Sequence, residues 1–118
     1  MFNFEKLDVW QKAIDFADLV YNQTRNFPAE ERFGLTNQLR RAAVSISSNI
    51  AEGSSRTSKT DFARFIEIAT GSVFEVTSQS FVARRQEFFD EKQFHQIYES
   101  AEELSRMLSG LRRSLFPD

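Results

Sequence analysis

The side chains that could carry out catalysis are few in this sequence of 118 residues, which has one histidine and no cysteine. Cysteine nucleophiles are therefore excluded, and a serine nucleophile would need a histidine oriented by a carboxylate. His95 follows the expected first residue of a helix and lies among Phe94, Gln96 and Tyr98, where a surface or edge imidazole is the ordinary interpretation. We therefore expect no enzymatic activity.

The sequence lacks the residue spacings that bind metals and cofactors in known helical and phosphate-binding sites. A di-iron site in a helical bundle uses Glu-x-x-His on two helices with further inward glutamates. The residue three before His95 is Lys92, and Glu67 and Glu75 point away from the apolar stripe of their helix. The four glycines stand alone, so there is no glycine-rich phosphate loop. The sequence predicts no metal, no cofactor and no small-molecule substrate.

A line of polar side chains is a candidate binding surface for which a structural and a functional role are both open. At spacings of seven, four, three and four, they fall on one flank of a helix: Gln38, Ser45, Asn49, Glu52 and Arg56. One interpretation is structural, with Asn49 bonded to a backbone or side-chain partner across the bundle and Glu52 paired with Arg56. The other makes this flank a contact line for a second subunit or a ligand.

Five cations in the middle of the chain could contact phosphates: Arg40, Arg41, Arg56, Lys59 and Arg64. The net charge of −2 and the pI near 5.5 give no general attraction to nucleic acid or to an anionic membrane. A solvated face with interspersed acids is therefore the simpler interpretation. A ring of subunits with a local basic stripe could still bind RNA, because several weak phosphate contacts act together.

Apolar side chains recur at helical spacing in four segments, near residues 8–25, 29–53, 59–85 and 91–115. With only 4 Gly and 2 Pro there is little material for strands and turns. A chain of this length is one domain, residues 1–118. The predicted fold is an all-α, antiparallel, up-down four-helix bundle with short connections.

The expected helix ends follow from capping residues. Asp8, Ser58 and Asp90 are placed to cap the first, third and fourth helices, and Gln93 completes a capping box with Asp90. Gly53 is expected to end the second helix in the left-handed conformation.

The first and third helices carry more apolar surface than one bundle needs. On the first helix, Val9, Ala13, Phe16 and Val20 form the expected core stripe, and Trp10, Ile14 and Tyr21 widen it to about 160°, against ~100° for a simple bundle helix. On the third, Phe74 and Phe81 lie on a column separate from the core stripe. Because contiguous exposed apolar patches usually mark interfaces, we predict a homo-oligomer that uses these five residues.

The longest uncharged run is ten residues, between Arg41 and Glu52, against the ~20 apolar residues that a membrane span needs. The first five residues have neither the basic start nor the apolar run of a signal peptide. We expect a cytoplasmic protein.

The second segment also carries a resemblance. Arg41-Ala-Ala-Val-Ser-Ile-Ser-Ser-Asn-Ile-Ala-Glu-Gly53 followed by Arg56 resembles the signature of the four-helix-bundle family named for the 23S ribosomal RNA intervening sequence. Further matches are Leu7-Asp-Val-Trp-Gln-Lys-Ala13, Phe27-Pro28 with Phe33-Gly-Leu35, Gln38-Leu-Arg-Arg41, and Ala69-Thr-Gly-Ser72 with Glu75. They cover nearly the whole chain in order. The resemblance implies a small bacterial bundle protein, commonly pentameric, without established enzymatic activity; accessory proteins of diversity-generating retroelements belong to the same family.

Two hypotheses for function follow. The first is a non-catalytic oligomeric binding module whose surface contacts RNA or an RNA-associated protein. The alternative is a protein-interaction scaffold without a nucleic-acid role, working through the aromatic-rich helix faces.

Overall fold

Four α-helices make up most of the protein in the computed structural model, which describes residues 1–117. They are α1 (Asp8–Gln23), α2 (Leu35–Ser54), α3 (Lys59–Arg85) and α4 (Glu91–Leu115). Two short 3-10 helices, η1 (Asn3–Lys6) and η2 (Ala29–Glu31), precede α1 and α2.

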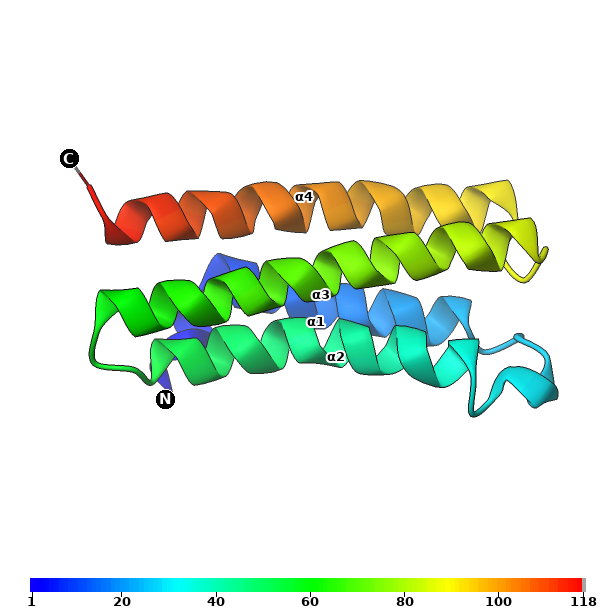
Figure 1. Cartoon of the computed structure of the whole chain (residues 1–118), viewed down its shortest axis with the longest axis horizontal. Coiled ribbons are helices and arrows are strands. Elements are labelled where there is room, and N and C mark those ends of the chain that lie inside the picture. Colours follow the sequence, from blue (N-terminus) through cyan, green and yellow to red (C-terminus); the bar gives the residue numbers. More distant parts are fainter. Residues whose placement is uncertain (118) are drawn as a thin grey trace.

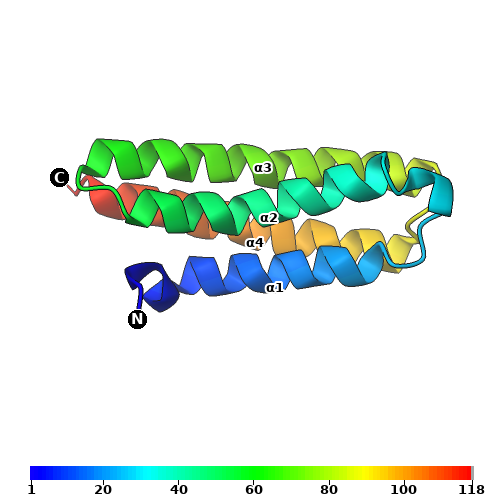
Figure 2. The ribbon, with the colours of Figure 1, turned by 90° about the horizontal axis from the view of Figure 1, so that it is seen from below.

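The helices run alternately up and down and form an elongated bundle of 46 × 24 × 21 Å (Figures 1 and 2). α2 packs between α1 and α3, and α4 closes the bundle by packing against both α3 and α1. The α2–α3 contact is the most extensive of the four. This arrangement confirms the predicted four-helix bundle, whereas its assembly into a ring stays a prediction.

The core follows the periodicity of the sequence. In α1 the predicted residues Val9, Ala13, Phe16 and Val20 are all at most 4% exposed. The seven-residue pattern of α4 is buried from Phe94 to Leu108 but only partly buried at its last two apolar positions. With 25 residues, α4 is longer than α1 with 16, so its last turns have fewer neighbours to cover them.

α1 starts at residue 8 as predicted, but its predicted cap and the predicted start of the second helix were wrong. Leu7, not Asp8, is the N-cap of α1, and Asp8 is the first helical residue. The second helix starts at Leu35 rather than near residue 29, because η2 ends at Glu31 and Gly34 takes a non-helical backbone as the N-cap of α2. Arg32 and Phe33 therefore lie in a turn and not on a helix.

Gly53 also behaves differently from the prediction. No glycine of the described chain has a positive φ, and α2 continues through Gly53 to Ser54. A Cβ built on Gly53 would lie 2.7 Å from Phe65 Cβ and 2.9 Å from Phe62 Cδ1. Glycine is needed here because α3 approaches the α2 backbone closely, which is a requirement of packing between helices and not of helix termination.

The predicted caps of α3 and α4 are confirmed. Ser58 Oγ accepts a hydrogen bond from the backbone N–H of Asp61 (3.0 Å), and Asp90 and Gln93 form a reciprocal capping box with N–H···O distances of 2.7 and 2.9 Å. We expect Asp90→Ala to lower the free energy of unfolding by ~1 kcal/mol in urea denaturation. Asp8→Ala is the matched control and should cost less, because Asp8 makes no capping bond; equal costs would contradict this role for Asp90.

Candidate functional site

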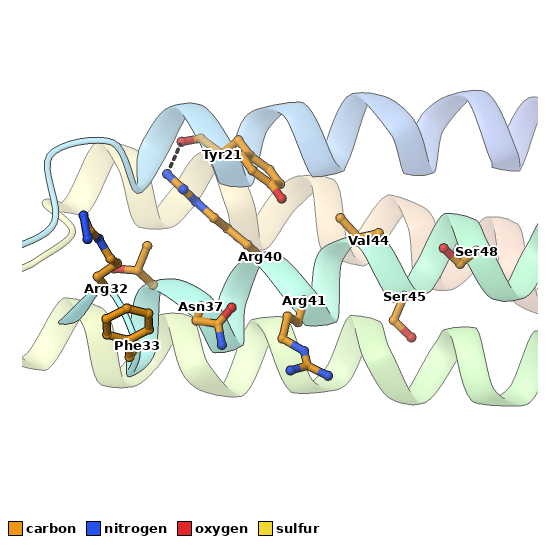
Figure 3. A pocket seen from close by; sticks show the side chains of 10 residues that line it. Tyr21, Arg32, Phe33, Asn37, Arg40, Arg41, Val44, Ser45 and Ser48 are labelled. Carbon is orange, nitrogen blue, oxygen red and sulfur yellow. Dashed lines mark hydrogen bonds between the residues drawn. The ribbon is translucent and has the colours of Figure 1, made fainter.

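A broad hollow lies between the last turn of α1 and the first turns of α2, at the end of the bundle where η2 connects them (Figure 3). It is an open groove of about 720 Å³. Its wall combines arginines, aromatic rings and small polar side chains, and none of its residues is acidic: Tyr21, Arg32, Phe33, Thr36, Asn37, Arg40, Arg41, Val44, Ser45 and Ser48.

A smaller hollow of about 290 Å³ adjoins it and shares Arg32, Thr36 and Arg40. Its other lining residues are again free of carboxylates: Thr24, Arg25, Phe27, Pro28 and Ala29. We call the two hollows together the arginine groove, after Arg25, Arg32, Arg40 and Arg41. The carboxylates nearest in sequence are Glu30 and Glu31 of η2.

Arg40 is held at the centre of the arginine groove by neutral groups. Its Nε donates a hydrogen bond to Thr24 Oγ1 (2.9 Å), its Nη2 donates to the Tyr21 carbonyl (3.5 Å), and the guanidinium carbon lies 4.6 Å from the centre of the Tyr21 ring. Figure 3 shows the side chain reaching from α2 across to Tyr21 on α1. These contacts fix the orientation of the cation without neutralising its charge.

The other three arginines of the groove also lack a carboxylate partner. Arg25 donates only to the amide oxygen of Asn22 (3.2 and 3.1 Å), and the Arg32 guanidinium lies 5.7 Å from the Phe33 ring centre. Within residues 1–117 none of the four forms an ion pair with a carboxylate. Each of the two adjoining hollows is lined by three guanidinium groups without an ion-pair partner. Such a cluster makes a site for an anion, phosphate above all, because the paired N–H groups match its oxygens.

Glu31 contacts the start of α2 and pairs with none of the four arginines. Its Oε1 accepts a hydrogen bond from the backbone N–H of Leu35 (3.2 Å), at the start of α2. Negative charge is favourable at a helix N-terminus, and this contact places a carboxylate there. The carboxylate therefore serves the helix end.

The structure divides the five predicted phosphate contacts into two groups. Arg40 and Arg41 line the arginine groove. The others, Arg56, Lys59 and Arg64, lie around the α2–α3 connection, roughly 24 Å further along α2. Arg56 there pairs with Glu52 (3.5 Å) and covers the Phe65 ring, and Arg64 pairs with Asp61 (3.1 Å). This second group is largely compensated by its own acids.

The predicted polar line serves the bundle itself. Asn49 Nδ2 donates to the carbonyl and hydroxyl oxygens of Ser45 (2.8 and 3.0 Å), and Ser72 Oγ of α3 donates to Ser45 Oγ (3.0 Å). Gln38 Oε1 accepts from Gln79 Nε2 at 3.5 Å, and Glu52 pairs with Arg56. The Glu52–Arg56 pair is therefore as predicted, whereas Asn49 bonds within its own helix and not across the bundle. Ser45 also lines the arginine groove.

The predicted interface residues differ in exposure. Trp10 and Ile14 are half-buried, with Trp10 packed on Phe4 at 4.9 Å between ring centres. Phe74 is 65% exposed, and Phe81 is 41% exposed. The last two line an open apolar hollow of about 450 Å³ between α3 and α4, together with Val73, Thr77, Ser78, Tyr98, Ala101, Glu102 and Ser105. Tyr21, the fifth, belongs to the arginine groove instead.

The features tested for catalysis lie away from the groove. His95 is exposed on α4, 3.6 Å from Glu91, which agrees with the expected surface imidazole. Among residues 1–117 no three His, Cys, Asp or Glu side chains gather closely enough to hold a metal ion. Across the same residues, no helix has the length and apolar character needed to cross a membrane.

Several residues of the arginine groove escaped the sequence analysis. Arg25, Arg32 and Asn37 were not proposed as contacts, and Phe33 was noted only as part of a family motif. The available signal was an aromatic residue directly after an arginine and before a glycine, Arg32-Phe33-Gly34.

The fold and the arginine groove define the class of the molecule: a small up-and-down four-helix-bundle protein with a cationic hollow between two of its helices. The chain belongs to the 23S rRNA-intervening sequence protein family, whose model matches residues 5–110. A similar solved structure is a protein of unknown function from the S23 ribosomal protein family of Bacteroides thetaiotaomicron, with a TM-score of 0.79 and 24% identity over 89% of this chain and 98% of that chain. That likeness supports the fold. A search of curated proteins gave no match.

Proposed function

We propose that this protein is a non-catalytic binding module that forms a homo-oligomeric ring and holds RNA in the arginine groove. One observation carries the proposal: in a protein of net charge −2, four arginines without a carboxylate partner line the same pair of hollows. Of the other arginines, Arg56, Arg64, Arg84 and Arg112 are paired with acids, whereas Arg85, Arg106 and Arg113 form no ion pair within residues 1–117. RNA fits the groove because each nucleotide brings a phosphate.

Assembly would compensate for the modest charge of one subunit. A single groove offers only a few phosphate contacts, and each is weak at physiological salt. A ring repeats the groove on every subunit, so a strand held by one copy meets the next at high effective concentration. The exposed apolar surface around Phe74 and Phe81 supports the assembly on which this depends.

The test is binding of a structured RNA with unpaired loops, measured by fluorescence anisotropy over a salt titration. We expect the double variant Arg40→Glu/Arg41→Glu to bind at least about tenfold more weakly, the scale of one charge-assisted contact. Each lost contact should also reduce the slope of log affinity against log salt by about 0.7–0.9.

The matched control is Arg106→Glu/Arg113→Glu, which makes the same charge change at two exposed arginines of α4. It should lose much less affinity than the groove variant. Equal losses of affinity would mean that RNA binding depends only on the net charge of the protein. Absence of binding by the unmodified protein at low salt would reject the RNA proposal.

The second candidate function is a protein-interaction scaffold, favoured by the apolar hollow between α3 and α4. It predicts a partner protein that remains bound after nuclease treatment and is released by changes at Phe74 rather than at Arg40. A partner lost on nuclease treatment favours the RNA proposal instead.

A further inference from the structure

We propose that the arginine groove takes one unpaired RNA nucleotide, with its phosphate among Arg25, Arg32 and Arg40 and its base stacked on Phe33. This inference rests on the proposed function, because it specifies which form of RNA the same site recognises. A single-stranded segment is required, since a base inside a duplex is already stacked on both faces.

Phe33 is the first observation. Its side chain is 87% exposed, at the mouth of the larger hollow and in the turn between η2 and α2 (Figure 3). Within residues 1–117 its ring pairs with no other aromatic ring, and its one recorded ring contact is the Arg32 guanidinium. A planar apolar surface held beside cations is the arrangement that stacks a base while its phosphate is neutralised.

The smaller hollow is the second observation, and it suits the phosphate. Arg25, Arg32 and Arg40 surround it, and the bonds of Arg25 to Asn22 and of Arg40 to Thr24 hold two of the three guanidinium groups in place. Because these cations are already oriented by neutral groups, a phosphate would lose little side-chain entropy on binding.

Thr36 is the third observation. It is 8% exposed, lines both hollows, and its hydroxyl oxygen has no hydrogen-bond partner in the described residues. Buried hydroxyl groups nearly always have a partner. An unpartnered one between the two hollows fits a site that a ligand completes.

The remaining wall of the larger hollow can contact the base edge or the next phosphate. Asn37 lies on α2 between Phe33 and Arg40, and Figure 3 shows Ser45 and Ser48 further along the helix, beyond Arg41. The amide and hydroxyl groups can donate or accept, so they are compatible with any of the four bases. We therefore expect weak sequence preference and a clear preference for unpaired strands.

The experiment compares two probes at one salt concentration: a single-stranded RNA of about 12 nucleotides, and the same strand annealed to its complement. The unmodified protein should bind the single strand more tightly. Phe33→Ala should weaken single-strand binding about 10- to 100-fold, the effect of losing one base–aromatic stack, and leave duplex binding and the salt slope unchanged. Phe33→Trp should retain the affinity.

The matched control is Phe2→Ala, which removes another exposed phenylalanine (71%) at the opposite end of the bundle and should change neither affinity. Equal binding of both probes, with Phe33→Ala indifferent, would overturn the stacking inference and leave the RNA proposal standing. If neither probe binds at low salt, the stacking inference and the RNA proposal are both wrong. If Phe33→Ala reduces the oligomer size in light scattering and weakens both probes alike, Phe33 is a contact between copies and the inference is wrong.

Discussion

Gly53→Ala is expected to lower the free energy of unfolding by about 2 kcal/mol, although alanine is the better helix former. Removing a glycine from a helix interior alone would stabilise it by about 0.5–1 kcal/mol. The new Cβ would lie 2.7 Å from Phe65 Cβ, an atom fixed to the α3 backbone, so the two helices must separate. Overpacking of this kind costs up to ~3 kcal/mol, which outweighs the gain in propensity.

The matched control for Gly53 is Gly71→Ala. Gly71 is also helical, but a Cβ there meets nothing within 4 Å, so only the gain in helix propensity remains. We expect Gly71→Ala to raise the free energy of unfolding by about 0.5–1 kcal/mol. Urea denaturation of both variants at one protein concentration measures the difference. Two substitutions of the same sign and size would contradict the close approach of α2 and α3.

Periodicity predicted most of the fold because it repeats over many residues. The apolar stripe of α1 and the seven-residue pattern of α4 each identify a buried face through several turns, and the caps at Ser58 and Asp90 depend on local bonding. The start of α2 depends on one turn only. The predicted boundary near residue 29 included the separate 3-10 turn Ala29–Glu31 in the helix, which in fact starts at Leu35.

Gly53 shows a different limit of prediction. A glycine near the expected end of a helix is a good signal for a left-handed stop. In this chain the same residue instead accommodates Phe62 and Phe65 of the next helix. Only the approach of α3, a property of the packed bundle, distinguishes the two roles.

The arginine groove could be predicted only in part, because its two walls come from different helices. Tyr21 and Thr24 end α1 and Arg40 lies on α2, so their contact depends on which helix faces lie side by side. The spacing of Glu52 and Arg56 already predicted their ion pair, which the structure contains. Nothing in the sequence indicated that neutral groups of α1 would hold Arg40.

Phe74→Asp is expected to dissociate the proposed oligomer. The ring is 65% exposed in one subunit and makes no aromatic contact within residues 1–117, so the bundle itself should tolerate the change. In an interface, an aromatic residue of this size contributes about 2–4 kcal/mol, and a buried carboxylate adds its own desolvation cost. Each contact between subunits should therefore weaken by about 30-fold or more.

Phe81→Asp is the less informative variant because Phe81 also belongs to the bundle. Its ring packs edge-on against Phe94 at 4.8 Å, and the Arg84 guanidinium covers it at 5.2 Å. Loss of assembly in that variant could reflect a disturbed α3–α4 contact. Phe74→Asp separates the two effects, since helix content by circular dichroism should stay at the level of the unmodified protein.

Ile68→Asp is the matched control for Phe74→Asp: it places the same charge at an exposed apolar residue of α3 (47%), roughly 120° around the helix from Phe74. Light scattering of the three proteins at micromolar concentration should show oligomers for the unmodified chain and for Ile68→Asp, and monomers for Phe74→Asp. A monomeric unmodified protein would remove the ring from the proposal. The arginine groove would then act with the contacts of one copy alone, and the salt dependence of RNA binding would be correspondingly shallow.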